Sequence, residues 1–585
     1  MQKRWNILEP APRDFIAGCR VSQEACGQLP EAITHLLWHR GIRTPEAVAM
    51  FLQPAYERDI HDPFLFSNMQ TAVARIFSAL DRGERILIFG DYDADGVTSS
   101  TILISTLRDI AEKRGSTAAI VSYIPHRDRE GYGLNLTQVE QFATEQVNLV
   151  ISVDCGIACP NEAAALKTHG IDFIIVDHHQ FGEILPDAIL IHPSIPGETY
   201  PFKFLSAAGV SWKLACALMT EARARGLEIA AGTEKWLLDL VAISTVADVV
   251  PLVGENRALL AYGLRVLRKT RRVGLQALIS TAGIQPQQIS SRDIGFAIAP
   301  RLNAASRMAH ASIALQLLLA PTRDEAETIA HDVEQLNRAR QQATIGMMTR
   351  ADELISAIPG QASAYVLWDA AWSPALVGLV AGRIAERYGV PVAAIGKHGD
   401  TWIGSGRSIP SYDITEAVKR SGEGLLTRAG GHPQACGFAL AADEHVPQFA
   451  ERLQRDAATQ IRSDVVGPEL VIHAEIDPTE IHWPLIDALG QLEPFGQGNA
   501  EPLFAVRGVE VTRSNIVGKD ATHLRLVCRT GAGEQISFIA FGFAHRAAEA
   551  SVGMKIDVAC TIAAEDRNGR REIRNKVIDF RASGA

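Results

Sequence analysis

Three apolar runs in the chain each stop at or just before an aspartate. They cover Ile86–Phe89, Leu149–Val153 and Phe173–Val176. Segments with helical spacing, 99–111 and 161–169, alternate with these runs, and this order predicts βαβ units and a parallel sheet. Binding crevices of open parallel sheets lie at the carboxyl ends of the strands. The aspartates that follow the three runs are therefore expected to meet at one place.

The rest of the pattern divides the chain further. Apolar residues recur at helical spacing from about 324 to 358, which predicts a helix about 50 Å long at 1.5 Å per residue. After Gly467-Pro468 the pattern changes to short alternating strands, among them 503–506 and 509–512, with Asn568-Gly569 as a hairpin turn. This pattern is typical of a small barrel of the oligonucleotide-binding type. We expect a helical lead-in over 1–75, an α/β parallel-sheet domain over 76–323, a long linking helix over 324–358, a smaller α/β domain over 359–462 and an all-β barrel over 463–585.

Composition changes this picture little. The 585 residues are 47% apolar and 21% charged, as in ordinary globular domains, and no apolar stretch approaches membrane-spanning length. The eight cysteines are scattered without zinc or redox spacing, which favours reduced thiols and a cytoplasmic location. A net charge of −10 argues against a uniformly basic surface but leaves room for a local basic groove.

The acidic positions predict a metal site. Asp91-Tyr92-Asp93-Ala94-Asp95-Gly96 resembles half of a calcium-binding EF-hand loop, but position twelve is Ile102 rather than Glu and a strand precedes the loop. Zinc is disfavoured because adjacent histidines point in different directions and no cysteine cluster is present. Oxygen ligands with one imidazole favour two Mn²⁺ or Mg²⁺ ions. For Asp91 a turn-forming role alone stays open. The candidate ligands are Asp93, Asp95, Asp154, His178 and Asp248.

Further motifs resemble the DHH phosphoesterase superfamily and, within it, the RecJ family of single-strand-specific exonucleases. The motifs that carry the resemblance are Asp93-Ala-Asp95-Gly96, Asp154-Cys155-Gly156, Asp177-His178-His179, Thr245–Leu252, Pro125-His-Arg127, Glu130–Asn135, Pro300–Arg307, Gly404–Ser408, Gly430-Gly431-His432 and Pro494-Phe495-Gly496 with Gly498-Asn499. The second α/β block looks like the associated DHHA1 domain. The chain departs from the family at Trp372-Ser373, where a histidine usually follows the tryptophan.

The resemblance implies roles for individual residues. The five candidate ligands would hold metal, His179 would act on the scissile phosphate, and Asp177 would orient the adjacent histidines. Asn303 is expected among the catalytic groups, along the path of the strand. Residues expected to bind substrate phosphates are Arg127, Ser405, Arg407, Arg301, Arg307 and His432.

The resemblance also implies an activity. We expect a two-metal enzyme that hydrolyses single-stranded DNA from its 5′ end to 5′-mononucleotides in DNA repair and recombination. The barrel would hold the strand by stacking and charge, with at least half of its candidate phenylalanines structural. These barrel candidates are Phe504, Phe538, Phe541, Phe543, Arg567, Arg570, Arg571, Arg574 and Lys576.

Two other functions stay open at this point. One is a phosphodiesterase of short oligoribonucleotides or cyclic dinucleotides, and the other is a non-catalytic DNA-binding scaffold. Expected partners of the exonuclease are single-stranded DNA, a helicase of the RecQ type and a single-strand-binding protein. We expect no membrane association, and a monomer.

Overall fold

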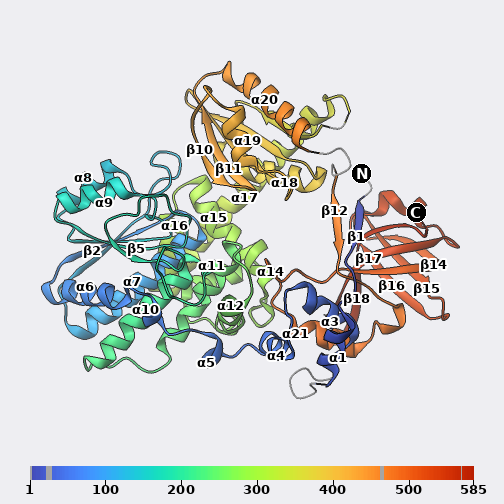
Figure 1. Cartoon of the computed structure of the whole chain (residues 1–585), viewed down its shortest axis with the longest axis horizontal. Coiled ribbons are helices and arrows are strands. Elements are labelled where there is room, and N and C mark those ends of the chain that lie inside the picture. The colour runs from blue at the N-terminus through green and yellow to red at the C-terminus, as the bar shows by residue number, and fades with distance from the viewer. Residues whose placement is uncertain (1–2, 22–28, 361, 462–466, 568–569, 585) are drawn as a thin grey trace. The chain divides into compact units, whose positions relative to one another are not determined.

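The chain forms two compact units (Figure 1). The computed structural model describes residues 3–21, 29–360, 362–461, 467–567 and 570–584. One unit comprises 49–339 and 492–500, and the other comprises 1–48, 340–491 and 501–585. The predicted long helix is present as α17 (Arg323–Ser356), which has 34 residues. It contributes residues to both units.

A five-stranded parallel sheet organises the first unit. Its strands are β3 (Ala119–Tyr123), β2 (Arg85–Gly90), β4 (Leu149–Val153), β5 (Asp172–Val176) and β6 (Ile189–Ile191), in that spatial order. Helices α6 (Met69–Arg82), α7 (Ala94–Arg114) and α10 (Ala207–Ala224) cover one face, and α8 (Leu136–Thr144) and α9 (Pro160–Thr168) cover the other (Figure 1).

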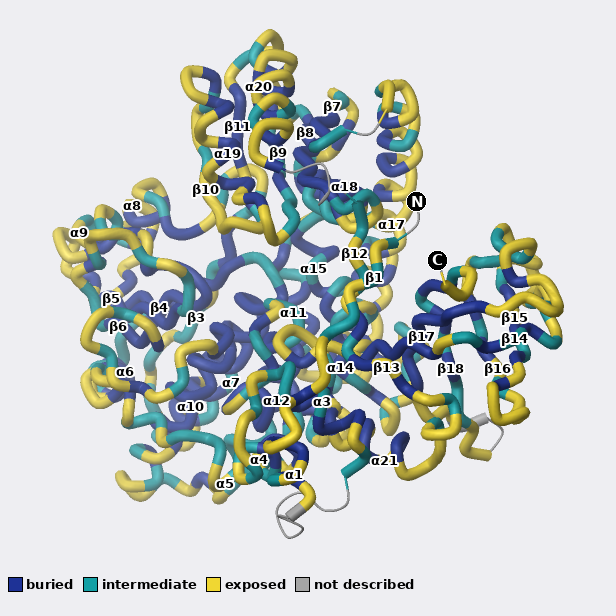
Figure 2. The backbone as a smooth tube through the Cα atoms, turned by 45° about the vertical axis from the view of Figure 1, so that its right-hand side comes forward, coloured by how far each residue is buried: buried dark blue, intermediate teal, exposed yellow. Residues whose placement is uncertain are grey.

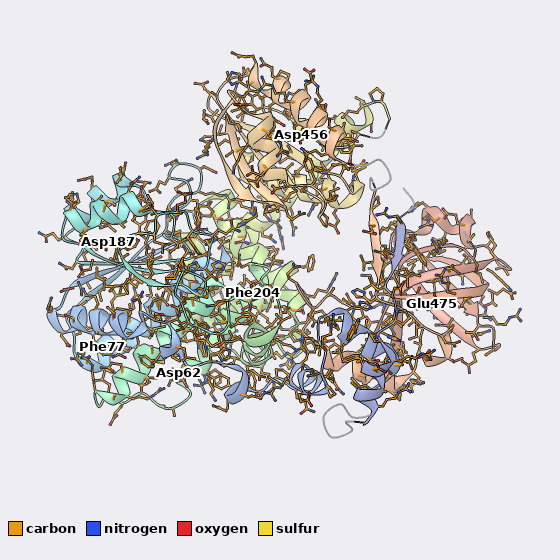
Figure 3. The ribbon with its side chains drawn as sticks, in the orientation of Figure 1. Asp62, Phe77, Asp187, Phe204, Asp456 and Glu475 are labelled. Carbon is orange, nitrogen blue, oxygen red and sulfur yellow. The ribbon has the colours of Figure 1, made fainter. Side chains whose placement is uncertain are left out.

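Burial on both faces explains why the strands are continuous apolar runs. In β2, Ile86 and Ile88 belong to the core under α6, α7 and α10, whereas Leu87 and Phe89 belong to the core under α8 and α9. Alternate side chains of a strand point to opposite faces, so a strand between two helical layers needs apolar residues throughout. Phe77 of α6, labelled in Figure 3, is one of the fully buried side chains of the first core.

Further helices complete this unit. They are α4 (Pro45–Leu52, which crosses its boundary), α5 (Tyr56–Asp59), α11 (Leu238–Ala247), α12 (Gly254–Leu267), α13 (Val273–Thr281), α14 (Ser291–Asp293), a π-helix over Ile294–Ile298, α15 (Ala299–Met308) and α16 (Ser312–Leu319). Figure 2 shows α7 and α11 mostly in the colour of buried residues, and α7 is buried along its first half.

The amino terminus corrects the expectation of a purely helical lead-in. Helices α1 (Arg13–Val21) and α3 (Glu31–His39) are present, but β1 (Arg4–Ile7) precedes them and pairs in parallel with β12 (Glu469–Ile472). Trp5 explains part of the attachment, because its indole N–H donates to Asp579 (2.8 Å) and its ring lies under the Arg581 guanidinium.

The smaller α/β domain is built on a mixed sheet. Its spatial order is β10 (Leu426–His432), β11 (Ala435–Leu440), β9 (Thr401–Arg407), β8 (Val392–His398) and β7 (Tyr365–Trp368), and only β7 and β8 are parallel. The accompanying helices are α18 (Pro374–Tyr388), α19 (Ile414–Ser421) and α20 (His445–Gln460). Alternate residues Trp402, Cys436, Phe438 and Leu440 form its core with α19 and α20.

A closed barrel follows α21 (Trp483–Gln491). Five strands close through the pairing of β14 with β17, and the two-residue strand β13 (Ala474–Glu475) joins β14 at its edge. The five are β14 (Phe504–Val517), β15 (His523–Arg529), β16 (Gln535–Ala540), β17 (Lys555–Arg567) and β18 (Arg570–Ala582). The fold class is as predicted. Two strands expected over 503–506 and 509–512 are one bent strand, β14, whose register shifts between Val506 and Val509. The expected turn at 568–569 lies outside the described residues.

Among the described helices, none combines the length and the apolar character needed to cross a bilayer.

A buried ion pair in the first unit gives a test of this fold. Lys213 and Glu255 have no exposed side-chain surface, and Glu255 also accepts hydrogen bonds from the Tyr200 hydroxyl and the His61 amide. We expect Lys213→Met to lower the free energy of unfolding by about 3–5 kcal/mol, because it leaves an unpaired buried carboxylate. Urea titration followed by tryptophan fluorescence measures this, since Trp212 is the neighbouring residue.

The matched control is Lys113→Met on α7, whose partner Asp109 forms a half-exposed pair. That change should cost less than about 1 kcal/mol. Equal urea midpoints for the two variants would contradict the packing described here.

Candidate metal centre and phosphate-binding residues

The ends of three neighbouring strands bring the acidic residues together. Strands β2, β4 and β5 are adjacent and parallel, so the residues that follow them meet at one edge of the sheet. Three overlapping groups have ligand atoms within 4.8 Å of one another: Asp91, Asp93 and Asp154; Asp95, His178 and Asp248; and Asp154, Asp177, His178 and His179. All five ligands predicted from the sequence belong to these groups.

Asp93 connects the first strand to the helix that follows it. Its side chain caps α7 by accepting from the amides of Asp95 and Gly96 (2.8 and 3.1 Å). Gly96 is required because a Cβ there would lie 2.4 Å from the Asp91 carbonyl oxygen. Helix α7 therefore begins directly against the backbone of Asp91.

Asp95 is engaged by the protein itself. Its Oδ1 accepts from the amide of Ala208 (2.8 Å) and the hydroxyl of Ser244 (2.6 Å), and its Oδ2 accepts from the amide of Ala207 (2.9 Å). Ala207 and Ala208 begin α10, so the positive end of that helix also stabilises the carboxylate. Asp95 therefore has less bonding capacity left for a cation than its position in the motif suggests.

Asp154 and Asp248 face His178 from two directions. The Nε2 atom of His178 lies 3.4 Å from Asp154 Oδ1, 3.6 Å from Asp248 Oδ2 and 3.8 Å from Asp95 Oδ2. Asp154 has a φ of 63° and Asp248 ends α11 just before Val249, whose φ is 58°. Left-handed backbone at residues other than glycine is uncommon and collects at functional sites.

Burial and mutual repulsion disfavour the charged carboxylates. Burial, followed by the charges of neighbouring aspartates, raises the pKa of Asp91, Asp154 and Asp248 well above the ordinary carboxyl value. Burial lowers the pKa of His178. Each of these shifts keeps the group neutral. Positive charge placed between the carboxylates would lower their pKa values again and would keep His178 neutral, which is the form of histidine that binds metal.

Buried polar atoms without hydrogen-bond partners also indicate a site for positive charge. Among the described residues, buried Asp91 Oδ1, Asp154 Oδ1 and His178 Nε2 have no hydrogen-bond partner. Buried polar atoms are nearly always satisfied in native proteins. Carboxylate oxygens with one imidazole suit Mg²⁺ or Mn²⁺, so this donor set fits divalent cations. Asp91, for which the sequence left a turn-forming role open, is better suited to bind a cation than Asp95.

His179 is oriented differently from His178. Its Nδ1–H donates to Asp177 (2.8 Å), and the Tyr132 hydroxyl, which donates to the Asp154 carbonyl (3.1 Å), lies 3.1 Å from the same nitrogen. Burial would lower the pKa of His179, but the hydrogen bond and charge of Asp177 raise it to about 9. Asp177 itself is fully buried, and also accepts from the amides of Ile157, His178 and His179. The arrangement holds His179 protonated.

Other predicted residues of this unit lie near the same loop or serve it. Asn303 Oδ1 accepts from the amide of Ala94 (2.7 Å), so its side chain holds the start of α7. Arg127 lies 4.6 Å from the ring centroid of Tyr92, and the charges of Arg127 and Arg307 both act on the pKa of Tyr92. Arg301 is bound to Glu334 and to the Ala297 carbonyl and is largely buried.

Strand register places three of the predicted phosphate-binding residues, Ser405, Arg407 and His432, on one face of the smaller sheet. Arg407 of β9 pairs with Ala435 of β11, which pairs with His432 of β10. Directly paired residues point to the same face, and so do residues two apart in a strand. Ser405, Arg407 and His432 therefore share the face opposite the core. The Arg407 guanidinium donates to the Ser405 hydroxyl (2.8 Å).

Two further residues, one on helix α18 and one on this face, were not predicted from the sequence. Gly378 of α18 makes room for the pair, since a Cβ there would lie 3.0 Å from Arg407 Nη2 and 3.1 Å from Ser405 Oγ. Arg428 is exposed on β10 and has the same orientation as His432. Only the strand pairing could have identified Arg428, because nothing in its local sequence distinguishes it.

In the barrel, only part of the predicted stacking set is exposed. Phe504 and Phe538 are core residues, and Phe543 packs against Phe580, so the expectation that at least half are structural is confirmed. Phe541 is 39% exposed, with His523 against its edge and the Arg574 guanidinium 5.1 Å from its ring centroid. The side chain of Arg567 lies outside the described residues.

Comparison with known proteins follows the same division of the chain. Residues 85–245 match the DHH family, N-terminal domain, residues 360–459 match the DHHA1 domain, and residues 472–579 match the RecJ OB domain. The single-stranded-DNA-specific exonuclease RecJ of Bacillus subtilis is 34% identical over 554 residues, covering 94% of this chain and 68% of that protein. The RecJ of Salmonella typhimurium is 33% identical, covering 88% and 90%.

The chain belongs to the RecJ family.

A solved RecJ structure has the same fold. The crystal structure of Thermus thermophilus RecJ in complex with Mn²⁺ matches this RecJ-family chain with a TM-score of 0.82 and 29% identity, covering all of this chain and 80% of that one. A second crystal structure of the Thermus protein, in complex with Mg²⁺, matches with a TM-score of 0.76 and 28% identity, covering all of this chain and 79% of that one.

The different surroundings of Asp91 and Asp95 give a test. We expect Asp91→Asn to keep the thermal stability of the cation-free protein but to lose most of the rise in Tm on adding Mn²⁺, because an unpartnered ligand oxygen is removed. Asp95→Asn should instead lower the Tm of the cation-free protein, because its hydrogen bonds to α10 and Ser244 are disrupted. Differential scanning calorimetry with EDTA or MnCl₂ measures both. An Mn²⁺-induced rise in Asp91→Asn equal to that of the parent would contradict this assignment.

Proposed function

We propose that this RecJ-family protein is a metal-dependent exonuclease that hydrolyses single-stranded DNA from the 5′ end to 5′-mononucleotides. The observation that carries the proposal is the convergence of buried, unpartnered carboxylate and imidazole atoms at the edge of the parallel sheet. Its relatives are named single-stranded-DNA-specific exonucleases, and the RecJ of Thermus thermophilus has been solved in complex with Mn²⁺ and in complex with Mg²⁺. The proposed role of this activity is in DNA repair and recombination.

The proposed cation ligands are Asp91, Asp93, Asp154, His178 and Asp248, with Asp95 as a further contact. Two divalent cations would lower the pKa of a water molecule and hold the phosphoryl oxygens for in-line displacement. Asp95 fixes the start of α7 against α10, and Asn303 fixes it through the amide of Ala94. His179, kept protonated by Asp177, donates from Nε2 to the scissile phosphate or to the leaving 3′ oxygen.

We assign recognition of the 5′-phosphate to arginines. Arg127 lies beside the Asp91–Asp93 turn, held over Tyr92. Ser405 and Arg407 present a hydroxyl and a guanidinium from one sheet face, where Gly378 leaves space, and a guanidinium matches phosphate oxygens bidentately. Arg307 and His432 are proposed to contact following phosphates. Arg301 is proposed to act through its ion pair with Glu334 rather than by direct contact.

The barrel is proposed to hold the following strand. Phe541 offers an exposed ring for base stacking and Arg574 a neighbouring positive charge. A nucleic-acid-binding barrel favours a long strand over a dinucleotide substrate, and the complete ligand set favours an enzyme over a scaffold. We keep the division into a lead-in, the DHH domain, the linking helix, the DHHA1 domain and the barrel as the proposed domain organisation.

The wider setting is also a proposal. The seven described cysteines are free and buried, which suits the reducing cytoplasm. Because the proposed substrate is single-stranded, we infer that the protein acts as a monomer after a helicase of the RecQ type and alongside a single-strand-binding protein.

Digestion of labelled oligonucleotides tests the proposed function. Single strands carrying a 5′-phosphate should release mononucleotides from the 5′ end in Mn²⁺ or Mg²⁺, and EDTA should stop the reaction. Blunt duplexes should resist digestion. Asp154→Ala should still bind single strands in a gel-shift assay and release nothing. Release of long fragments, or loss of nucleotides from the 3′ end first, would refute the proposal.

The role of Arg407 gives a separate prediction. Arg407→Ala should lower kcat/KM for 5′-phosphorylated strands about tenfold to a hundredfold, because charged hydrogen bonds contribute about 1.5–3 kcal/mol. Strands with a 5′-hydroxyl should lose much less. Arg452→Ala is the control, since that exposed arginine lies on α20 against the other face of the same sheet. Equal losses on both substrates would show that Arg407 does not read the terminal phosphate.

A further inference from the structure

The segment 492–500, which leads into the barrel, is docked on the parallel-sheet domain beside the last proposed metal ligand. It belongs to the same compact unit as the metal-site residues. The buried guanidinium of Arg257 donates to the carbonyls of Leu492 (3.0 Å) and Glu493 (2.9 Å), and also to the carbonyl of Phe51. The Ser291 hydroxyl donates to the carbonyl of Phe495 (2.6 Å).

The segment is also closed on itself. The fully buried side-chain amide of Asn499 donates to the carbonyls of Leu492 (2.8 Å) and Pro494 (2.9 Å). The backbones of Gly496 and Asn499 exchange two hydrogen bonds (2.9 and 3.1 Å). These bonds fix the conformation of 492–500, so its contacts can fix the position of a neighbouring segment.

Its neighbour is the turn that follows Asp248. The amide of Leu252 donates to the Gln497 carbonyl (2.8 Å), and a Cβ on Gly496 would lie 2.5 Å from Leu252 Cδ1. Gly498, with a φ of 70°, lies against Pro251. A Cβ added to Gly498 would lie 3.3 Å from the Cβ of Pro251. On the other side, the Asn256 side chain donates to the Pro251 carbonyl (3.1 Å).

This turn needs external support. Val249, the residue after Asp248, has a φ of 58° and is 62% exposed, so its own side chain packs against little. A β-branched residue in the left-handed region is sterically disfavoured and persists only where its surroundings fix it. Contacts from 492–500 and from Asn256 hold Pro251 and Leu252, the residues that follow shortly after Val249.

We propose that segment 492–500 is a positioning element for the metal centre: through Pro251 and Leu252 it fixes the turn that aims Asp248 at the cations. Asn499, Gly496 and Ser291 act through Asp248 and touch neither cation nor DNA. The inference rests on the proposed function, because it assigns the segment to that same site. It also gives the motif Pro494–Asn499, which precedes the barrel, a function in the catalytic domain.

One glycine pair provides the test on the full-length protein. Gly496→Ala adds a methyl group that must displace buried Leu252, whereas Gly490→Ala, six residues earlier in α21, meets nothing within 4 Å. We expect Gly496→Ala to weaken Mn²⁺ binding about tenfold, as supporting residues around metal ligands usually do. It should lower kcat on single-stranded DNA with little change in KM. Gly490→Ala should match the parent. Electron paramagnetic resonance of free Mn²⁺ measures the affinity without turnover.

A compensating change separates positioning from general damage. Gly496→Ala combined with Leu252→Val removes the carbon that clashes, and volume-conserving swaps are the ones that cores tolerate. The double variant should regain most of the Mn²⁺ affinity. Two unrelated packing defects would instead lower the affinity further than Gly496→Ala alone. Parental affinity in Gly496→Ala, or no recovery in the double variant, overturns the proposal. If the parent binds Mn²⁺ but does not degrade single strands, the proposed function fails while the positioning claim is still judged by affinity. A parent that binds no Mn²⁺ overturns both.

Discussion

The metal centre is governed by one electrostatic constraint, the burial of several like charges at the same edge of a sheet. Asp91, Asp95 and Asp154 have almost no contact with solvent, and Asp248 joins them from α11. Asp95 is satisfied by the protein, through two amides at the start of α10 and the Ser244 hydroxyl. Asp91 and Asp154 each keep a buried oxygen without a hydrogen-bond partner, and these two require protons or cations, because a buried carboxylate without a partner is costly. Cations satisfy them without loss of charge, and the same cations supply the chemistry.

The backbone around the centre is shaped to keep these charges together. Asp93 caps α7, and Gly96 lets that helix begin against Asp91. Asp154 and Val249, the residue after Asp248, occupy left-handed conformations. Such conformations persist where neighbouring contacts fix them. The segment 492–500 supplies those contacts at the turn after Asp248, so part of the metal centre is held by residues at the entrance to the barrel.

The sequence predicted the sheet and the convergence of the acidic residues at its edge because the signals for both are local. A parallel strand buried on both faces is apolar throughout, and an aspartate at its end is visible by position alone. Other features depend on distant partners. The saturation of Asp95 comes from amides 112 residues away, so the spacing of Asp91, Asp93 and Asp95 could not show which carboxylate is left unpartnered. The pairing of β1 with β12 joins four-residue strands with no pairing signal, and the bend in β14 interrupts alternation and imitates two strands. The shared orientation of Arg428 and His432 appears only once the register of β10 is known.

Anomalous X-ray scattering at the manganese edge, from crystals of the full chain grown with Mn²⁺, would locate the cations. We expect two strong peaks at the carboxyl edge of the parallel sheet, with Asp91, Asp93, Asp154, His178 and Asp248 as their protein ligands. Mn²⁺ bound elsewhere, or no peak at this edge, would contradict the claim that buried carboxylates there exist to hold catalytic cations.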